Sequence, residues 1–340
     1  MTTRLSLDAQ AQALNMLSAG FNATEISDDL GIPRTTLRAF FKEAGKETVH
    51  CERWGIDDLP ETRPSGILSA VRPLSVSIPK PAARLVQEGK PYTGLFYGDN
   101  HYPHNDEATT QIVAAITADL QPDVLVNVGD LLDAYELSRF DKNPERKHSI
   151  QDEIDMARQH LASMRLIAPN AVFTLIEGNH EDRLRRLLWN LPGEAKVLSN
   201  ITAFRQTLTW PSLLGLEDMH ITHVPYGQEQ HHNIFPGMMV KHGHIVRQKS
   251  GYSAHGEYDR WRISGASGHT HRLAVYYHDR DVWMETGCCC KLQATYTPYC
   301  NWQNGFMVVT RTPTGSIAVE PIQVRNEEAS FRGNIYRASL

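Results

Sequence analysis

Five short motifs rich in Asp, His and Asn follow one another along this 340-residue chain. Their residue types bind divalent metal ions, since carboxylates, imidazoles and amide oxygens ligate Mn, Fe, Zn and Mg. One such motif is weak evidence, but five in one order indicate two adjacent metal ions and the hydrolysis of phosphate esters. The motifs are Asp99-Asn-His101, Gly129-Asp130-Leu-Leu-Asp133, Gly178-Asn179-His180-Glu181, His242-Gly-His244 and Gly268-His269-Thr-His271.

The spacing within the first and last motifs favours paired ligands. Asp99 and His101 are two positions apart, as are His269 and His271. Alternate residues of an extended chain point to the same side. Each pair can therefore offer two donor atoms to one site.

The second and third motifs add different chemistry. Gly129 allows close approach of the backbone beside Asp130, whose carboxylate can bridge two ions. Asn179 offers an amide oxygen, which is an unusual ligand, and the neighbouring His180 is free to give a proton to a leaving group. The chain has sixteen histidines, so the inference depends on the ordered set and not on any single residue.

Apolar runs that precede the motifs predict strands that deliver them. Residues 95–98, 124–128 and 171–176 end just before the first three motifs, and 111–120 and 150–167 have helical periodicity between them. Reactive groups at the carboxyl ends of alternating strands are typical of α/β folds. Later segments alternate as strands do and predict a second sheet, packed face to face on the first with helices outside: 219–224, 238–241, 273–278, 282–286, 306–312 and 317–324.

Motif for motif, residues 92–325 resemble the calcineurin-like metallophosphoesterase superfamily. The strings GDLLD from Gly129, SRFD from Ser138, GNHEDR from Gly178 and NWQNGF from Asn301 look most like its phage and prophage branch. The resemblance implies a four-layer αββα sandwich. It also implies two divalent ions, with Mn²⁺ expected and Fe, Zn, Mg or Ni as alternatives.

The resemblance also assigns roles to the residues. Asp130 would bridge the ions, and His180 would be the general acid in attack on phosphorus by a metal-bound hydroxide. His244 is expected to contact substrate or a ligand rather than a metal. One ion would be held by Asp99, His101, Asp130 and His271, and the other by Asp130, Asn179, His242 and His269.

Two arginines near the motifs are candidate substrate contacts. Arg139 or Arg183 could hold a phosphate oxygen in a bidentate contact. Both have an ordinary alternative as charges on a helix surface.

The first 46 residues predict a small all-α unit of the helix-turn-helix type. Periodic apolar residues give helices from Ser6 to Gly20, over 23–30 and from about residue 34 to 44, with Gly31-Ile-Pro33 as the turn. The pattern resembles resolvase-type DNA-binding helices. The candidate contacts to DNA lie on the third helix and are Arg34, Thr35, Arg38 and Lys42. Since this unit has five basic and five acidic residues, docking on a protein stays open.

The remaining segments are expected to connect and to close the chain. Residues 47–91 are rich in Pro and Ser and predict a linker, and residues 326–340 predict a C-terminal tail. Cys288 to Cys290 are adjacent, which favours reduced thiols at a buried strand end over a thiolate metal site or a nucleophile.

Composition limits the partners and the compartment. The net charge of −5 excludes a chain that binds nucleic acid through its overall charge, so such binding needs a local basic face. No apolar run approaches the ~18 residues of a membrane span, and the N-terminus lacks a signal-peptide core. We therefore expect a cytoplasmic protein of a bacterium or a phage-infected cell, with a homodimer left open.

Four functions remain open on sequence grounds. A DNA nuclease or phosphodiesterase positioned by the helix-turn-helix is favoured. The alternatives are a phosphodiesterase or phosphomonoesterase for nucleotides and other small esters, a protein phosphatase, and a DNA-binding regulator that keeps the domain as a scaffold. Intact ligands argue against the last.

Overall fold

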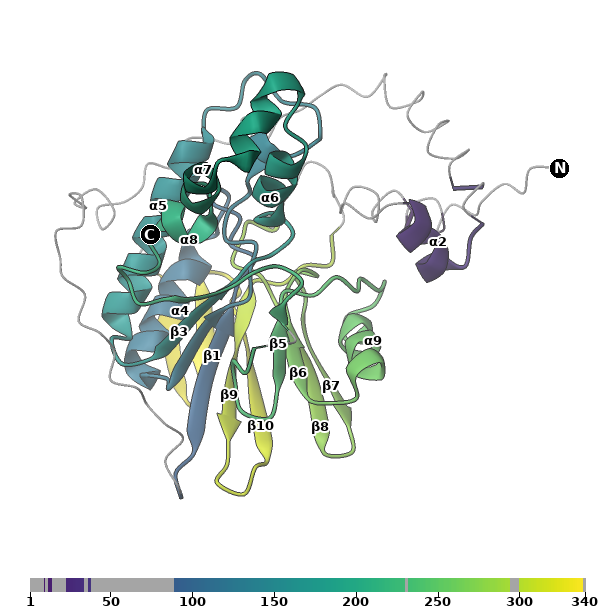
Figure 1. Ribbon diagram of the computed structural model, residues 1–340. Coiled ribbons are helices and arrows are strands. Elements are labelled where there is room, and N and C mark those ends of the chain that lie inside the picture. Colours follow the sequence, from purple (N-terminus) through teal and green to yellow (C-terminus); the bar gives the residue numbers. More distant parts are fainter. Residues whose placement is uncertain are drawn as a thin grey trace. The chain divides into compact units, whose positions relative to one another are not determined.

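The computed structural model describes residues 9, 12–13, 23–33, 36–37, 89–229, 232–293 and 300–338. The chain divides into two compact units, a small unit (1–60 with 293–300) and a main unit (61–292 with 301–340). Each is described by itself. In the main unit, two β-sheets pack face to face and helices cover their outer faces (Figure 1). No helix of the described residues is long and apolar enough to cross a membrane.

The first sheet combines parallel and antiparallel strands. Four strands run parallel, as expected for strands joined by helices. Of two later strands, one lies antiparallel beside the first of these four, and the other lies antiparallel beside that one at the edge of the sheet. In spatial order the strands are β10 (Ile317–Gln323), β9 (Gly305–Arg311), β1 (Tyr92–Tyr97), β2 (Val124–Asn127), β3 (Val172–Ile176) and β4 (Thr222–Val224).

Helices cover one face of this sheet. Asp106 caps the first of them by accepting from the Thr109 amide, and Ser149 and Asp152 form a capping box at the start of the second. Both long helices were predicted, the second with its bounds unchanged. The helices are α4 (Glu107–Leu120), α5 (Ile150–Ile167), α6 (Asp182–Trp189), α7 (Thr202–Thr207) and α8 (Trp210–Leu214), with 3-10 turns η3 (Tyr135–Leu137) and η4 (Gly193–Asn200).

The two faces of the first sheet follow the two-residue repeat of its strands. Leu95, Leu125 and Phe173 are in register and pack against the helices, in what we call the helix-side core. The next residues along the strands, Phe96 and Val126, face the second sheet in the inter-sheet core. The sheet is thus buried on both faces, which explains its nearly continuous apolar runs.

The second sheet has four strands and carries one helix on its outer face. Val240, Ala266 and Met284 are in register and complete the inter-sheet core. Trp283 points the other way and packs under the helix α9 (Tyr252–Trp261). In spatial order the strands are β5 (Met239–Lys241), β6 (Gly265–Ser267), β8 (Asp281–Thr286) and β7 (Leu273–His278). The four-layer αββα sandwich is therefore confirmed.

One part of the predicted topology was wrong. Residues 219–224, 306–312 and 317–324, expected in the second sheet, contribute β4, β9 and β10 to the first. The reason is visible in β9, where Phe306 packs in the helix-side core and Met307 in the inter-sheet core. A run buried on both faces belongs beside the central strands.

The expected C-terminal tail also differs from the structure. It contains a hairpin of β11 (Glu328–Phe331) and β12 (Asn334–Arg337). Alternation puts Ala329 and Phe331 in the helix-side core, and the hydroxyl of Tyr336 donates to Asp119 on α4 at 2.8 Å. The short period-two pattern was overlooked because only two of its residues are apolar and buried.

In the small unit, the predicted second helix is present as α2 (Ala23–Leu30). Ile26 and Leu37 are fully buried, and the carbonyl of Pro33 accepts from the amides of Thr36 and Leu37, as in the first turn of a helix. Residues 34, 35, 38 and 42, the predicted DNA contacts, lie outside the described residues, as do 47–88 of the linker. The helix-turn-helix stays a prediction.

A buried arginine on α5 donates hydrogen bonds to the segments that precede β3 and β4, and its replacement gives a stability prediction. Arg165 is fully buried and donates to the carbonyls of Met219, Ala171 and His220 at 2.8–3.0 Å. Arg165→Met should lower the free energy of unfolding by about 3 kcal/mol, because buried carbonyls lose charged donors.

Urea denaturation followed by circular dichroism measures this effect. The control is Arg158→Met on the exposed side of the same helix, which should change stability by less than about 0.5 kcal/mol. Equal losses in the two variants would contradict the role assigned to the buried guanidinium.

Candidate metal centre

The motif residues lie just beyond the carboxyl ends of five strands. Asp99 follows β1, Asp130 follows β2 and Asn179 follows β3 in the first sheet, while His242 follows β5 and His269 follows β6 in the second. These strands run parallel within each sheet, so their carboxyl ends meet at one edge. The two sheets together supply the site.

Backbone bonds extend the parallel pairing past the strand ends. The amide of Asp99 donates to the carbonyl of Gly129 at 2.8 Å, and the amide of His101 donates to the carbonyl of Asp130 at 3.0 Å. These backbone hydrogen bonds alone fix the first two motifs relative to each other.

Five of the candidate ligands have left-handed backbone. Their φ angles lie between 48° and 69°, a region that costs a residue with a side chain about 1–3 kcal/mol. With this backbone the side chains that follow a strand converge on one site at the sheet edge, whereas in a continued strand they would alternate between the two faces of the sheet. The residues are Asp99, His101, Asp130, His269 and His271.

The first group of donors is compact. His271 Nε2 lies 3.2 Å from Asp99 Oδ1 and 3.0 Å from His101 Nε2. His101 Nε2 lies 3.8 Å from Asp130 Oδ2. The structure thus brings together the four residues predicted for one ion.

The second group shares the carboxylate of Asp130. His242 Nε2 lies 3.3 Å from Asp130 Oδ2 and 3.0 Å from Asn179 Oδ1. A nitrogen of His269 lies within 4.8 Å of the donor atoms of His242 and Asp130. These are the four residues predicted for the other ion, and Asp130 lies between the groups.

Charges inside the centre oppose the effect of burial. Burial would raise the pKa of Asp130, but the imidazoles of His180 and His242 outweigh it and hold that pKa well below its usual range. Burial likewise lowers the pKa of His242 and His271, yet Asp130 and Asp99 raise the pKa of these imidazoles to about 9. The carboxylate of Asp130 is therefore ionised and attracts positive charge.

Glycines make room for the carboxylates. A Cβ added to Gly178 would lie 2.1 Å from Asp130 Oδ1, and one added to Gly268 would lie 2.6 Å from Asp99 Oδ2. Gly129 has φ +105°, and its Cβ would meet the backbone of Gly178 at 2.7 Å. These glycines are required by close packing around the ligands.

The predicted proton donor sits beside the shared carboxylate. His180 Nε2 lies 3.9 Å from Asp130 Oδ2, and His180 Nδ1 donates to the carbonyl of Asp133 at 2.7 Å. Arg183, a predicted substrate contact, donates to His180 Nε2 at 2.9 Å and to the carbonyl of Asp133 at 2.6 Å. Asp133 therefore orients both groups.

Two residues of this arrangement were given no role from the sequence, although they stand within the motifs. Asp133 ends the second motif, and its carboxylate lies 3.3 Å from His180 Nδ1. Glu181 ends the third motif, is buried, and accepts from the amides of Gly178 and Asp130 at 2.7 and 3.0 Å and from that of Leu132 at 3.0 Å. Burial and the charge of Asp130 raise the pKa of Glu181 to about 7.

The other predicted substrate contacts lie outside the two donor groups. His244 accepts from Arg260 of α9 at 3.1 Å. Arg139 is exposed in the loop after η3. Their contact with substrate stays a prediction.

The donor set fits divalent cations. Carboxylates, an amide oxygen and imidazoles converge from two sides on Asp130, and nitrogen atoms approach one another at 3.0 Å as ligands of one ion do. In His242, Nδ1 donates to the carbonyl of Val128 at 2.9 Å, which leaves the lone pair of Nε2 directed at the centre.

Comparison with known proteins agrees with this geometry. The family model for calcineurin-like phosphoesterases matches residues 94–281, more than half of the chain. The Gene 54 proteins of Mycobacterium phages D29 and L5 are each 27% identical over 230 residues, covering 62% of this chain and 86% of theirs.

Solved structures are more distant. Vacuolar protein sorting 29 of Cryptosporidium parvum is 12% identical, with a TM-score of 0.38, and the match covers 73% of this chain and all of that one. The E. coli phosphoesterase YfcE is 13% identical, with a TM-score of 0.32, and the match covers 67% of this chain and 98% of that one.

Glu181 should support metal binding without touching the metal. In Glu181→Gln an NH₂ group must face one of the backbone amides that the carboxylate now accepts from, so the turns that carry Asp130 and Asn179 lose their anchor. We expect a 10- to 100-fold weaker affinity for Mn²⁺, measured by calorimetric titration of metal-free protein.

The matched control is Glu177→Gln at the end of the same strand. Glu177 accepts from His223 and from the Tyr226 amide instead, so its variant should bind Mn²⁺ as the wild type does. An unchanged affinity in Glu181→Gln would remove Glu181 from the support of the centre.

Proposed function

Since this chain belongs to the calcineurin-like phosphoesterase family and is therefore a metal-dependent phosphoester hydrolase, we propose that its substrate is DNA, cleaved at a phosphodiester bond. Hydrolysis of a phosphoester is supported by the convergence of two donor groups on Asp130, with His180 beside them, and the choice of DNA rests on a basic face of the second sheet. We further propose Mn²⁺ as the metal, because mixed carboxylate, amide and imidazole ligands suit it, and the cytoplasm of a phage-infected bacterium as the location.

The residues divide the chemistry between binding and proton transfer. Two divalent ions, when bound, supply positive charge to phosphoryl oxygens and lower the pKa of a water molecule. The first and second donor groups would each hold one ion, and Asp130 would keep them adjacent. The glycines beside the carboxylates leave room for these side chains.

We propose that His180 gives a proton to the leaving group. Its Nδ1 is held by the carbonyl of Asp133, so Nε2 faces the centre. As the oxygen of water bonds to phosphorus and gives up a proton to solvent, the bond to the leaving oxygen breaks, and His180, protonated on both ring nitrogens once Arg183 has turned to the substrate, donates the proton of Nε2 to that oxygen. Arg183, which contacts Nε2 in this structure, is positioned to take a phosphate oxygen instead.

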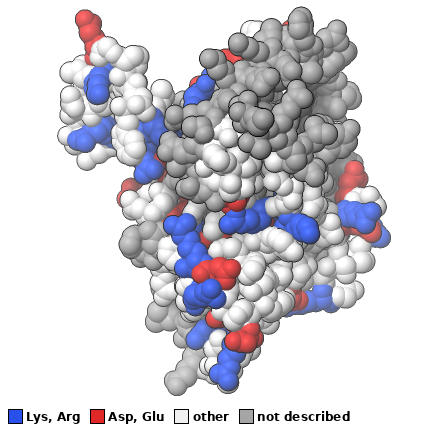
Figure 2. Space-filling model, turned by 90° about the vertical axis from the view of Figure 1, so that its right-hand side faces the viewer, with Lys and Arg blue, Asp and Glu red and all other residues white. Residues whose placement is uncertain are grey.

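A local basic face supports a polyanionic substrate. On the face that carries α9, Lys and Arg side chains outnumber acidic ones (Figure 2). The stretch between 242 and 291 has seven basic and five acidic residues. Glu257 and Glu285 are fully buried. Asp259 pairs with Arg262. Of the acidic residues, Asp279 and Asp281 remain, so an excess of positive charge is left at the surface. The basic residues of that stretch are Arg247, Lys249, Arg260, Arg262, Arg272, Arg280 and Lys291.

Part of this basic face adjoins a ligand-bearing strand of the second sheet. Arg260 donates to His244, two residues beyond His242. The backbone of Arg247 is joined to α9, since its amide donates to Ser253 at 2.9 Å. A backbone phosphate next to the one being cleaved could therefore reach these cations. We propose that the N-terminal helix-turn-helix, through Arg34, Thr35, Arg38 and Lys42, adds a second contact to DNA.

A specific observation keeps a small phosphate ester as the second candidate. A cavity of about 370 Å³ is lined by Tyr135, Lys142 and Arg146, among others. Arg146 contacts Asp133 at 3.1 Å, which connects the cavity wall to His180. Its volume is in the range of small-molecule pockets.

Two variants separate metal binding from proton transfer. His180→Ala should keep two Mn²⁺ per chain and lose about 10²- to 10⁴-fold in turnover of bis-para-nitrophenyl phosphate. Asp130→Asn should lose metal as well as activity, because the shared carboxylate is gone. Metal analysis of the purified variants beside the rate assay checks this, and loss of metal from His180→Ala would overturn the division of roles.

Removing the basic face should affect DNA but not a small ester. We expect Arg247→Ala/Lys249→Ala/Arg260→Ala to raise KM for duplex DNA about tenfold. The slope of log KM against log salt concentration should fall by about one unit for each DNA phosphate that the variant no longer binds. Hydrolysis of the chromogenic diester should not change.

The control carries the same loss of charge on exposed residues of the helical side, Arg158→Ala/Arg205→Ala/Arg337→Ala. Equal effects of the two triple variants on DNA would reject the basic face. In the same assay, Arg34→Ala/Arg38→Ala/Lys42→Ala reports on the helix-turn-helix. Activity of the wild type on small esters alone would reject DNA and favour the second candidate.

A further inference from the structure

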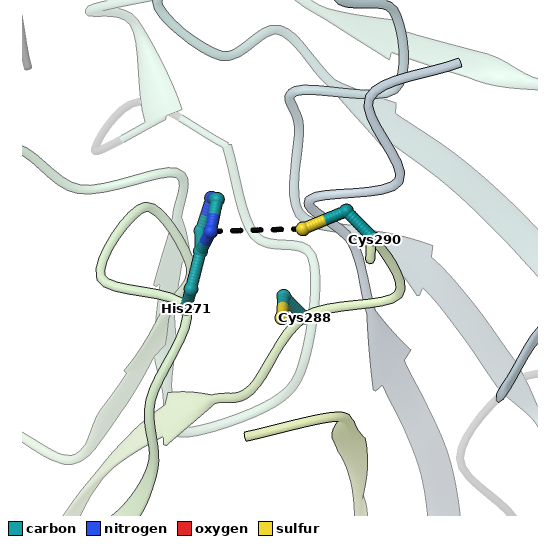
Figure 3. A group of neighbouring side chains, drawn as sticks. All are labelled: His271, Cys288 and Cys290. Carbon is teal, nitrogen blue, oxygen red and sulfur yellow. Dashed lines mark hydrogen bonds between the residues drawn. The ribbon is translucent and has the colours of Figure 1, made fainter. Parts of the chain in front are cut away.

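Three adjacent cysteines, Cys288 to Cys290, border the first donor group and have no role in the mechanism above. All three are buried. Their side chains alternate, so that Cys289 packs in the helix-side core while Cys288 and Cys290 lie beside His271. Figure 3 shows the sulfur of Cys290 pointing at the imidazole of His271, with Cys288 next to both.

Cys290 contacts the ring nitrogen of His271 that faces away from the centre. The sulfur lies 3.7 Å from Nδ1, within the range of a hydrogen bond from N–H to sulfur. His271 Nε2 lies at the opposite side of the ring, 3.2 Å from Asp99 Oδ1 and 3.0 Å from His101 Nε2. A proton held on Nδ1 leaves the lone pair of Nε2 free for a metal ion.

The same arrangement serves the second donor group with a different acceptor. There His242 Nδ1 donates to the carbonyl of Val128 at 2.9 Å. Outer hydrogen bonds of this kind fix the tautomer and the orientation of ligand histidines. For His271 the neighbour of Nδ1 is sulfur rather than oxygen.

The position of Cys290 is itself fixed by the backbone. Asn304 donates from Nδ2 to the carbonyl of Cys290 at 2.7 Å, and the amide of Cys289 donates to the carbonyl of Gly98 at 3.0 Å. Gly98 directly precedes Asp99, so the cysteine segment is anchored to the strand end that supplies the first ligand. The distance between the sulfur and His271 is therefore determined by the fold.

We propose that Cys290 is a positioning residue, which accepts a hydrogen bond from His271 Nδ1 and so directs His271 Nε2 into the metal centre. The inference rests on the proposed metal centre. The sulfur acts through the imidazole and does not touch the metal or the substrate.

The competing interpretation is a thiolate site in which the sulfurs themselves bind metal. His271, Cys288 and Cys290 have donor atoms within 4.8 Å of one another. Two contacts favour the positioning role: His271 Nε2 is already directed at Asp99, and the thiol of Cys288 donates to the carbonyl of Gln303 at 3.5 Å.

The test compares metal binding by full-length wild type, Cys290→Ala, Cys290→Ser and Cys289→Ala. Metal-free protein is titrated with Mn²⁺ by calorimetry, and each chain loaded with Co²⁺ is studied by optical spectroscopy. Cys289→Ala is the matched control, since it removes a neighbouring buried sulfur that faces the helix-side core. Cys290→Ser keeps an acceptor and covers the case in which the alanine variant does not fold.

We expect the wild type and Cys289→Ala each to bind two Mn²⁺ ions, and we expect the affinity for each ion to be the same in the two proteins. Cys290→Ala should bind one of the two ions 10- to 100-fold more weakly, with shifted d–d bands of Co²⁺, and Cys290→Ser should recover most of that affinity.

Unchanged affinities in Cys290→Ala, or an equal loss in Cys289→Ala, would overturn the positioning role. A sulfur-to-cobalt charge-transfer band in the wild type that disappears in Cys290→Ala would replace it with direct ligation. Absence of metal binding by the wild type would instead refute the proposed centre, together with any role that depends on it.

Discussion

The centre depends on backbone that turns in the left-handed region where strands end. Five ligand residues take φ between 48° and 69°, and at about 1–3 kcal/mol each the summed strain is comparable to the net stability of a typical domain. Regular structure around the site must offset that strain. Buried sheets, with Leu95 on one face and Phe96 on the other, and backbone bonds such as that from Asp99 to Gly129 supply the compensation. The stability of the sandwich therefore allows the strained backbone at the sheet edge to persist.

Electrostatics makes the same edge depend on cations. The carboxylates of Asp130 and Asp99 lie among imidazoles and raise the pKa of His242 and His271 to about 9. The two imidazole nitrogens at 3.0 Å from each other, His101 Nε2 and His271 Nε2, have little reason to converge unless a proton or a metal ion lies between them. The surrounding hydrogen bonds, from Val128 and Glu181 among others, hold ring and carboxylate orientations that the chain would not adopt in water.

Most of the site followed from the sequence, because its residues occur in short motifs directly after apolar runs. Asp130 and His180 became candidate residues through the short motifs that contain them and the resemblance that these motifs carry. What the sequence alone did not provide was long-range pairing. The strand at 306–312 could not be assigned to a sheet, since only the fold shows that Phe306 and Met307 enter different cores. Glu181 and Cys290 were not recognised as supports, because their partners, the amide of Asp130 and the ring of His271, are distant in sequence. The three-residue strand β6, Gly265–Ser267, was too short for any periodic pattern.

The two donor groups each draw on both sheets: Asp99 with His271 in one, Asn179 with His242 in the other. An ion in either group would cross-link the halves of the sandwich at the edge where the backbone is most strained. Ligands that bind only the folded chain stabilise it by mass action, by about 2.7 kcal/mol at one hundred times Kd. The supply of metal would then govern how long the protein survives as well as how fast it works. In a cell that withholds metal, the chain would become an easier target for proteases, and its abundance would fall together with its activity.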